Sequence, residues 1–243
     1  MLFKGFDGFM SSNDVVIDSA TVVLLSEFKS DKGSKELKVM LAKRSADLSF
    51  LPNHWVFPGG AVDDADYVPA GNHQNALQKA AVREVMEEVA VDISANELHH
   101  FAHWITPEAA PRRYSTYFFW TFLSEAQRQL AQVDGSELVE LAWLSAEQAI
   151  DMQANGQMPM LPPTLVSLLH LQGCKEERQV EVNLSSDKLE SITPKMAIDD
   201  ENLLMLYPGD NAYESGDIGF VNADEPQHRC VMQNNIWRFV DTR

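Results

Sequence analysis

The segment from Ala76 to Val89 constrains the fold most, because its residues and their spacing indicate a helix with two opposed faces. At about 100° per residue, the carboxylates of Glu87 and Glu88 lie about 60° and 40° on either side of Glu84. Three carboxylates therefore share one arc of the helix surface. Four apolar residues are expected on the opposite side, facing a core, and they are Val82, Val85, Met86 and Val89.

Carboxylates placed this closely repel one another, by roughly a few tenths of a kcal/mol for each exposed pair. A hard divalent cation offsets that repulsion directly, and Mg²⁺ or Mn²⁺ suits carboxylate oxygens combined with substrate phosphates. We therefore expect Mg²⁺ or Mn²⁺ as the cofactor, held by Glu84, Glu87 and Glu88. For the helix taken alone, the alternative is the solvated acidic face of an ordinary amphipathic helix.

The residues around this helix resemble the signature of the Nudix hydrolases, G-x5-E-x7-R-E-U-x-E-E-x-G-U, in which U is aliphatic. The matching segments are Phe57-Pro58-Gly59-Gly60 and Arg83-Glu84-Val85-Met86-Glu87-Glu88-Val89-Ala90-Val91. The resemblance implies an α+β protein, built as an α/β/α sandwich around a mixed β-sheet. It also implies an enzyme that hydrolyses a pyrophosphate bond with a divalent metal ion. Arg83 presents a fixed fork of donors, and its implied role is to orient a carboxylate of the motif.

Two positions depart from that signature. Counted from Gly60, the first Glu falls on Asp66, and 16 residues then separate Asp66 from Arg83 where the signature has seven. Counted back from Arg83, the same position falls on Asn75, so either Asp66 replaces this Glu or the Glu is absent. Ala90 stands at the Gly position, and it costs about 1 kcal/mol relative to Gly if the helix ends in a left-handed cap. Neither departure changes the three helix carboxylates.

Other segments resemble the coenzyme A diphosphatase branch of the family, and look closest to the peroxisomal acyl-CoA diphosphatases of animals and their bacterial relatives. They include Lys43-Arg44-Ser45, Phe50-Leu51-Pro52, Pro111-Arg112-Arg113-Tyr114 and Tyr207-Pro208-Gly209-Asp210. This resemblance implies hydrolysis of CoA or acyl-CoA to 3′,5′-ADP and phosphopantetheine or its acyl form. Two alternatives stay open. One is the same chemistry on ADP-ribose, NADH or a dinucleotide polyphosphate, and the other is a Nudix-fold binding module without catalysis.

Residues outside the helix complete the predicted site. A late loop often supplies a further carboxylate in this family, and Glu137 and Glu140 are the candidates. Arg112 and Arg113 could grip a phosphate, such as the 3′-phosphate of CoA, or could pair with surface carboxylates. One face of the aromatic strand expected from Tyr114 could stack on adenine. The candidate catalytic residues are Arg83, Glu84, Glu87, Glu88, Glu137 and Glu140, and the candidate substrate-binding residues are Arg44, Gly59, Gly60, Arg112 and Arg113.

Charge and composition restrict the partners. The 243 residues include 19 basic and 36 acidic side chains, for a net charge of −17, and 45% of them are hydrophobic. Nucleic acids and anionic membranes recruit dense Lys and Arg, so we expect neither, whereas a small nucleotide remains compatible. The sequence shows no membrane span and no export signal, and Cys174 and Cys230 are expected to be free thiols. We expect a soluble cytoplasmic protein.

We divide the chain into an N-terminal arm (1–14), a Nudix catalytic domain (15–156) and a C-terminal extension (157–243) packed on that domain. In the extension we expect a helix over residues 162–171 and strands at Val180–Leu184 and Arg229–Phe239. Minimal family members lack this extension, so its role is part of the substrate pocket or a dimer interface. The sequence leaves both roles open.

Overall fold

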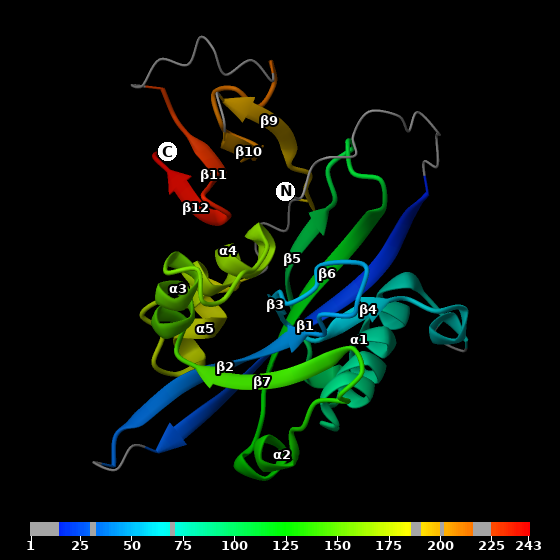
Figure 1. The fold of residues 1–243 in the computed structure, drawn as a ribbon. Helices are drawn as coiled ribbons and strands as arrows, with labels where there is room; N and C mark the ends of the chain where they lie inside the picture. Colours follow the sequence, from blue (N-terminus) through cyan, green and yellow to red (C-terminus); the bar gives the residue numbers. More distant parts are fainter. Residues whose placement is uncertain (1–14, 30–32, 69–70, 186–190, 200–201, 216–224) are drawn as a thin grey trace.

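The structure of the chain is a computed structural model, and it describes residues 15–29, 33–68, 71–185, 191–199, 202–215 and 225–243. Within these residues the main sheet has eight strands in the order β3-β2-β1-β6-β5-β8, with β4 paired to β1 and β7 paired to β2 (Figure 1). The pairs β1–β6 and β5–β8 are parallel and the others antiparallel, so the sheet is mixed. The strand bounds are β1 Val16–Lys29, β2 Lys35–Arg44, β3 Trp55–Val56, β4 Gly59–Ala61, β5 His99–Ile105, β6 Arg113–Phe122, β7 Leu138–Leu144 and β8 Ser191–Ile192. The predicted arm, residues 1–14, lies outside the described residues.

The central strand β1 is buried on both faces, as its run of β-branched and aliphatic residues predicts. Val22 and Leu24 pack in one hydrophobic cluster with the helix α1 (His73–Val89). Val23 and Leu25 pack in a second cluster on the opposite face of the sheet. Successive side chains of a strand point to opposite faces, so this one strand contributes to both cores.

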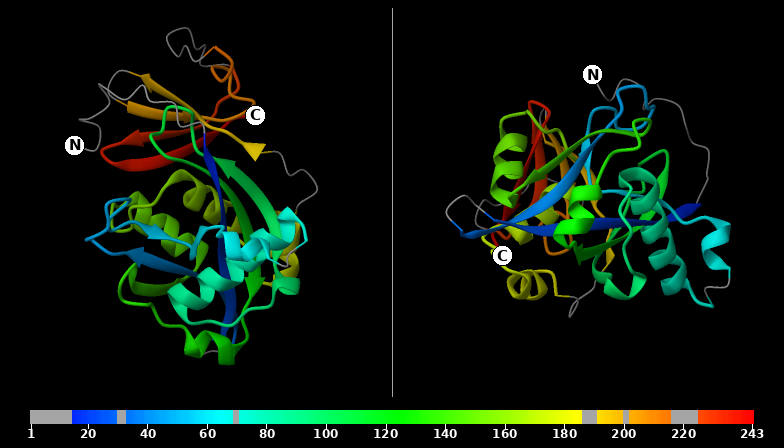
Figure 2. Two further views of the ribbon diagram at one scale, coloured as in Figure 1. Left: turned by 90° about the vertical axis from the view of Figure 1, so that its right-hand side faces the viewer. Right: turned by 90° about the horizontal axis from the view of Figure 1, so that it is seen from below.

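Helices cover both faces of the main sheet, which confirms the predicted α/β/α sandwich (Figure 2). Opposite α1 lie α3 (Ala146–Ala154), α4 (Pro162–Leu171) and α5 (Glu177–Asn183). Ser145 caps α3 and forms a capping box with Gln148. Three short helices complete this part: η1 Asp64–Tyr67, η2 Ala95–Glu97 and α2 Glu125–Leu130. No helix in the described residues is both long enough and apolar enough to span a membrane.

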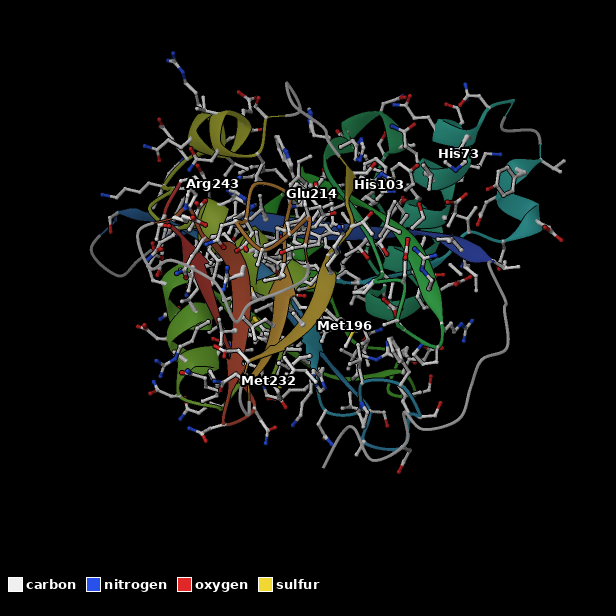
Figure 3. The ribbon with its side chains drawn as sticks, turned by 90° about the horizontal axis from the view of Figure 1, so that it is seen from above. His73, His103, Met196, Glu214, Met232 and Arg243 are labelled. Carbon is white, nitrogen blue, oxygen red and sulfur yellow. The ribbon has the colours of Figure 1, made fainter. Side chains whose placement is uncertain are left out.

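The end of the chain forms a second, antiparallel sheet in the order β12-β11-β10-β9. Its strands are β9 Lys195–Asp199, β10 Asn202–Leu206, β11 His228–Gln233 and β12 Ile236–Asp241. Figure 3 labels Met196 of β9 and Met232 of β11 on this sheet, apart from His103 on the main sheet. Trp237 belongs to the same hydrophobic cluster as α3 and α4, and its carbonyl accepts a hydrogen bond from the buried Gln153 side chain at 2.8 Å. Strand β12 is therefore in contact with α3, whereas the division of the chain at residue 156 stays a prediction.

Two expectations for the extension are wrong. The segment predicted as a strand at Val180–Leu184 lies mostly in α5, because Val180 and Leu184 are spaced i, i+4 and are both buried as one helical face. The predicted strand Arg229–Phe239 is a hairpin of β11 and β12. Asn234 and Asn235 have φ values of 53° and 63°, the left-handed pair that a two-residue hairpin turn requires. Both described cysteines, Cys174 and Cys230, are free thiols, as predicted.

Candidate active site

The acidic helix α1 lies against β4, and its rotation differs from the prediction at one apolar position. Val85 and Val89 are buried as expected, but Met86 is 44% exposed. The buried stripe instead continues through earlier residues of α1, namely Ala76, Leu77, Ala80 and Ala81. This rotation turns Glu88 inward, where it is only 7% exposed, and leaves the Glu87 side chain 59% exposed. The three carboxylates therefore sit in unequal surroundings.

Gly59 and Gly60 allow the backbone of β4 to approach those carboxylates closely. The Gly59 N–H donates to Oε2 of Glu88 at 2.8 Å. A Cβ atom added to Gly60 would overlap the Glu84 carboxylate, and one added to Gly59 would overlap the backbone of β1 at Ala20 and Thr21. Glycine is needed at both positions for steric reasons, and both lie beside the helix carboxylates, whereas their role in substrate binding stays a prediction.

Arg83 connects the helix to the loop that precedes it. Its Nη1 donates to Glu84 at 2.8 Å and to Glu87 at 3.0 Å. Its Nη2 donates to Asp66 at 3.0 Å and to the Ala61 carbonyl at 2.9 Å. These contacts support the predicted orienting role, since one guanidinium holds two carboxylates of the helix in place.

Asp66 lies in this cluster, in hydrogen-bond contact with Arg83. Asp66 is 5% exposed, and it accepts hydrogen bonds from the Asp63 N–H at 2.9 Å and from Arg83. Burial alone raises the pKa of a carboxyl, but these hydrogen bonds outweigh it and lower the pKa of Asp66. Asn75 is exposed in the first turn of α1, where its N–H is capped by Asn72. The lengthened loop therefore places the carboxylate of Asp66 against the guanidinium of Arg83.

The helix ends in a left-handed cap at Ala90. This residue has φ 56° and ψ 30°, and its N–H donates to the Met86 carbonyl at 3.1 Å. The helix thus ends in the left-handed conformation that glycine would adopt without strain, and the side chain of Ala90 makes this conformation costly.

Of the two late-loop candidates, Glu137 is coupled to the helix carboxylates and Glu140 is not. The negative charge of Glu137 raises the pKa of both Glu84 and Glu88. Glu140, on β7, is 56% exposed and pairs with Lys43 at 3.5 Å. The structure thus brings Glu137 toward the acidic helix and leaves Glu140 in a surface ion pair.

Asp134 holds the loop that carries Glu137, and the sequence interpretation missed it. Its Oδ2 accepts from the N–H groups of Ser136 and Glu137, both at 2.9 Å, and its Oδ1 accepts from the Leu138 N–H at 2.8 Å. Its own N–H donates to the Glu88 carbonyl at 3.0 Å. An Asp followed two residues later by Ser was the available signal, because Asp commonly accepts from N–H groups just after it in a turn.

Burial and mutual repulsion dominate the electrostatics of the helix carboxylates. Burial is the largest influence on Glu84 and raises its pKa, although Arg83 acts in the opposite direction. Burial also raises the pKa of Glu88 to about 8, against the Gly59 hydrogen bond, and Glu84 and Glu137 add to the rise. The guanidinium of Arg44 opposes it. A positive charge placed here would therefore stabilise the ionised forms.

The donor chemistry of these residues fits a hard divalent cation. All the candidate ligand atoms are carboxylate oxygens, the type that Mg²⁺ and Mn²⁺ prefer, and a cation would relieve the repulsion just described. Within the described residues, no three acidic, His or Cys side chains are yet gathered closely enough to hold an ion. Arg83 donates to oxygens of Glu84 and Glu87 in this arrangement.

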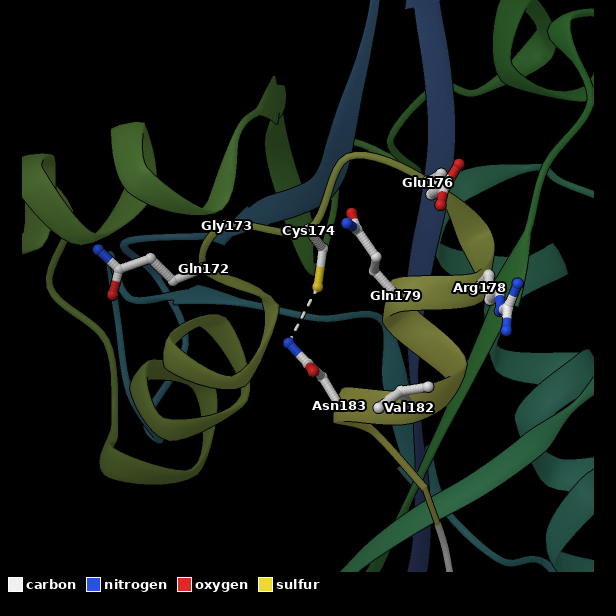
Figure 4. Close-up of a pocket in the computed structure, with 8 residues that line it drawn as sticks. All are labelled: Gln172, Gly173, Cys174, Glu176, Arg178, Gln179, Val182 and Asn183. Atoms are coloured by element: carbon white, nitrogen blue, oxygen red, sulfur yellow. Dashed lines mark hydrogen bonds between the residues drawn. The ribbon is translucent and has the colours of Figure 1, made fainter.

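The predicted phosphate-binding arginines are arranged separately. Arg112 lies with its guanidinium 5.1 Å from the ring centroid of Tyr114, whereas Arg113 donates to the Thr106 carbonyl at 3.2 Å. Neither forms an ion pair with an acidic residue among those the structure describes, so the surface-pair alternative gains no support. A cavity of about 380 Å³ lies elsewhere, between the end of α4 and α5, and none of the predicted site residues lines it (Figure 4).

Known protein sequences resemble this chain. The family profile described as NUDIX domain matches residues 18–163, more than half of the chain. A Caenorhabditis elegans protein named as nudix hydrolase 7 is 24% identical over an alignment that covers 80% of each chain. The peroxisomal coenzyme A diphosphatase ndx-8 of the same organism is 40% identical over 75 residues, or 31% of this chain and 27% of that protein.

A solved structure shows the same fold. The NUDIX hydrolase from Alicyclobacillus acidocaldarius superposes with a TM-score of 0.60 at 21% identity, and the match covers 73% of this chain and 99% of that chain. The profile match, the relatives and the fold lead to one conclusion. This chain belongs to the NUDIX family and is a hydrolase of pyrophosphate-containing substrates.

Proposed function

We propose that this chain hydrolyses the pyrophosphate of CoA or acyl-CoA, with Mg²⁺ or Mn²⁺, to give 3′,5′-ADP and phosphopantetheine or its acyl form. The single observation that carries the substrate is the 40% identity over 75 residues to a peroxisomal coenzyme A diphosphatase. The segments around Arg44 and Arg112 that resemble the CoA-cleaving branch support it.

In this proposal, Glu84, Glu87 and Glu88 would hold the divalent ion, which would supply positive charge against the phosphoryl oxygens and make water easier to deprotonate. Arg83 orients the carboxylates, and Glu137 adds a further acidic group beside them. Arg44, which lies close enough to lower the pKa of Glu88, binds a phosphate oxygen. Water adds its oxygen to one phosphorus as the bridging P–O bond breaks, and the departing phosphate carries the bridging oxygen away. Both a helix carboxylate and Glu137 remain candidates for accepting the water proton.

A substrate panel tests this proposal directly. Purified protein with Mg²⁺ or Mn²⁺ is offered CoA, short acyl-CoA, ADP-ribose, NADH and a dinucleotide polyphosphate, and the products are separated by chromatography. We expect 3′,5′-ADP to appear from CoA or acyl-CoA at the highest kcat/KM. Turnover of another nucleotide without any CoA species would reject the substrate and leave the family assignment intact.

A further inference from the structure

Strand β9 forms a free edge of the small C-terminal sheet. The strand order β12-β11-β10-β9 places it at the end of the sheet farthest from β12 (Figure 1). Within the residues that the structure describes, β10 is the only strand that pairs with Lys195–Asp199. Alternate residues of an antiparallel strand direct their N–H and C=O groups to opposite sides, so the outer edge of β9 presents unused backbone donors and acceptors.

The other terminal strand of this sheet, β12, is covered by the helical layer. Trp237 is 4% exposed and packs in one hydrophobic cluster with α3 and α4. The Gln153 side chain of α3 donates to the Trp237 carbonyl at 2.8 Å, so a backbone acceptor of β12 is already satisfied. In the described part of the chain, β9 is thus the terminal strand of this sheet whose edge can accept a further strand.

The sequence of β9, Lys195-Met196-Ala197-Ile198-Asp199, is complementary to itself when two copies run antiparallel. With Ala197 opposite Ala197 of a second copy, Lys195 faces Asp199 of that copy, and the two-fold axis repeats this pair at the other end. Opposite charges placed directly across two strands attract. Charged side chains on an edge strand usually oppose pairing, but in this register they favour it.

The apolar residues of β9 match in the same register. Met196 lies opposite Ile198 of the second copy, on one face of the sheet. Their partners on β10, Met205 and Leu203, pack against the hydrophobic cluster that includes α3 and α4. Ile198 is 74% exposed in the single chain, and Met196 of the second copy would cover it. Pairing therefore extends an existing apolar face and removes an exposed side chain from an open edge.

The two charged residues of β9 are free to form these pairs. The Lys195 ammonium lies 3.7 Å from a carboxylate oxygen of Glu214, whose side chain is 91% exposed, and 4.5 Å from the ring centroid of Tyr213. An ion pair this exposed is weak, because water and salt screen it, and it can be exchanged for another. Asp199 is exposed and forms no ion pair with a residue that the structure describes.

We propose that β9 pairs with β9 of a second copy of this chain, in the antiparallel register centred on Ala197. The pairing joins two small sheets into one continuous eight-stranded sheet. It assigns the C-terminal sheet to a dimer interface, one of the two roles that the sequence leaves open. The carboxylates of α1 take no part in it, so the interface does not depend on the proposed substrate.

Sedimentation velocity of the full chain over a range of concentrations tests this dimer. The wild type is expected to show a reversible monomer–dimer equilibrium. Lys195→Glu and Asp199→Lys should each raise the dimer Kd by roughly two- to 30-fold, because each removes two cross-strand attractions, and the repulsion that replaces them adds to the effect. Circular dichroism checks that both variants are folded. A wild type that stays monomeric up to roughly 100 μM would overturn the interface.

Charge exchange tests the register itself. The double variant Lys195→Glu/Asp199→Lys restores both opposite-charge pairs in a homodimer, and an equimolar mixture of the two single variants restores them in a heterodimer. Both should recover association close to that of the wild type. Arg238→Glu is the matched control, since Arg238 is an exposed basic residue on β12 of the same sheet, and it should leave the Kd unchanged. A dimer that neither single variant weakens, or that neither combination restores, would refute the pairing of β9.

Discussion

The left-handed cap at Ala90 leads to a measurable prediction about stability. A non-glycine residue in this conformation costs about 1–2 kcal/mol, and glycine removes that cost. Glycine also gives the unfolded chain more freedom, which offsets about 0.4–1 kcal/mol of the gain. Ala90 is only half-buried, so losing its methyl group matters little. Ala90→Gly should therefore raise the free energy of unfolding by about 0.8 kcal/mol, the difference between the midpoints of these two ranges.

A second glycine variant isolates the conformational cost. Ala131 is also a helix C-cap, at the end of α2, but its φ is −61°. Ala131→Gly relieves no backbone strain, so it should lower the free energy of unfolding by about 0.4–1 kcal/mol through the unfolded state alone. Because that entropic cost is common to both variants, their difference should equal the cost of the left-handed conformation, about 1–2 kcal/mol.

Thermal unfolding followed by circular dichroism is the assay, with urea unfolding as a check. For a chain of this length, 1 kcal/mol corresponds to about 2–4 °C in Tm, so Ala90→Gly should melt about 2–8 °C above Ala131→Gly. If the two variants melt together, the strain assigned to Ala90 is absent.

Three further predictions concern the site. Glu84→Gln should reduce kcat by at least about 100-fold without lowering Tm, because it removes a charge from a repelling, buried group; near-normal turnover would exclude that carboxylate from catalysis. Asp134→Ala should lower kcat as Glu137→Gln does. If Asp134 acts by holding Glu137, the double variant should lose no more kcat than Glu137→Gln alone. Ser94→Ala removes a comparable cap from η2 and, as the control, should leave kcat unchanged. The metal-free protein should lose stability as pH rises from 4.5 towards 8, since the folded state keeps the Glu88 proton that the unfolded chain has released. Glu88→Gln should flatten that slope in urea unfolding at pH 5 and pH 8, added Mg²⁺ should reduce it, and an unchanged slope in the variant would assign the effect to other groups.

The parts of the fold that were predicted correctly are those in which local pattern and tertiary environment agree. The apolar run of β1 is buried on both faces, and the helix formers of α1 form a helix whose capping and termination are local. The α5 segment was misread because alternating Val180 and Val182 resemble a strand, whereas packing selects the i, i+4 pair Val180 and Leu184.

The site was predictable in composition but not in detail. The motif located Arg83 and its three glutamates, yet no local pattern shows that Glu88 is buried while Glu87 is exposed, because β4 decides this from a distant position. The choice between Glu137 and Glu140 likewise depends on which of them the turn at Asp134 brings to the helix. Glu137 and Glu140 are the same residue type, so only their positions in the fold distinguish them.

The lengthened loop before α1 has a wider consequence for how chains of this kind are identified. The nine extra residues between Asp66 and Arg83 lengthen a surface connection and the start of α1, and the closure entropy of a loop grows by only about 0.6 kcal/mol for each doubling of its length. In this chain the longer interval still places an acid against the guanidinium of Arg83, and Asp66 makes that contact with a side chain shorter than that of Glu. A search that fixes the number of intervening residues would miss such proteins, whereas one that asks for the contact would find them.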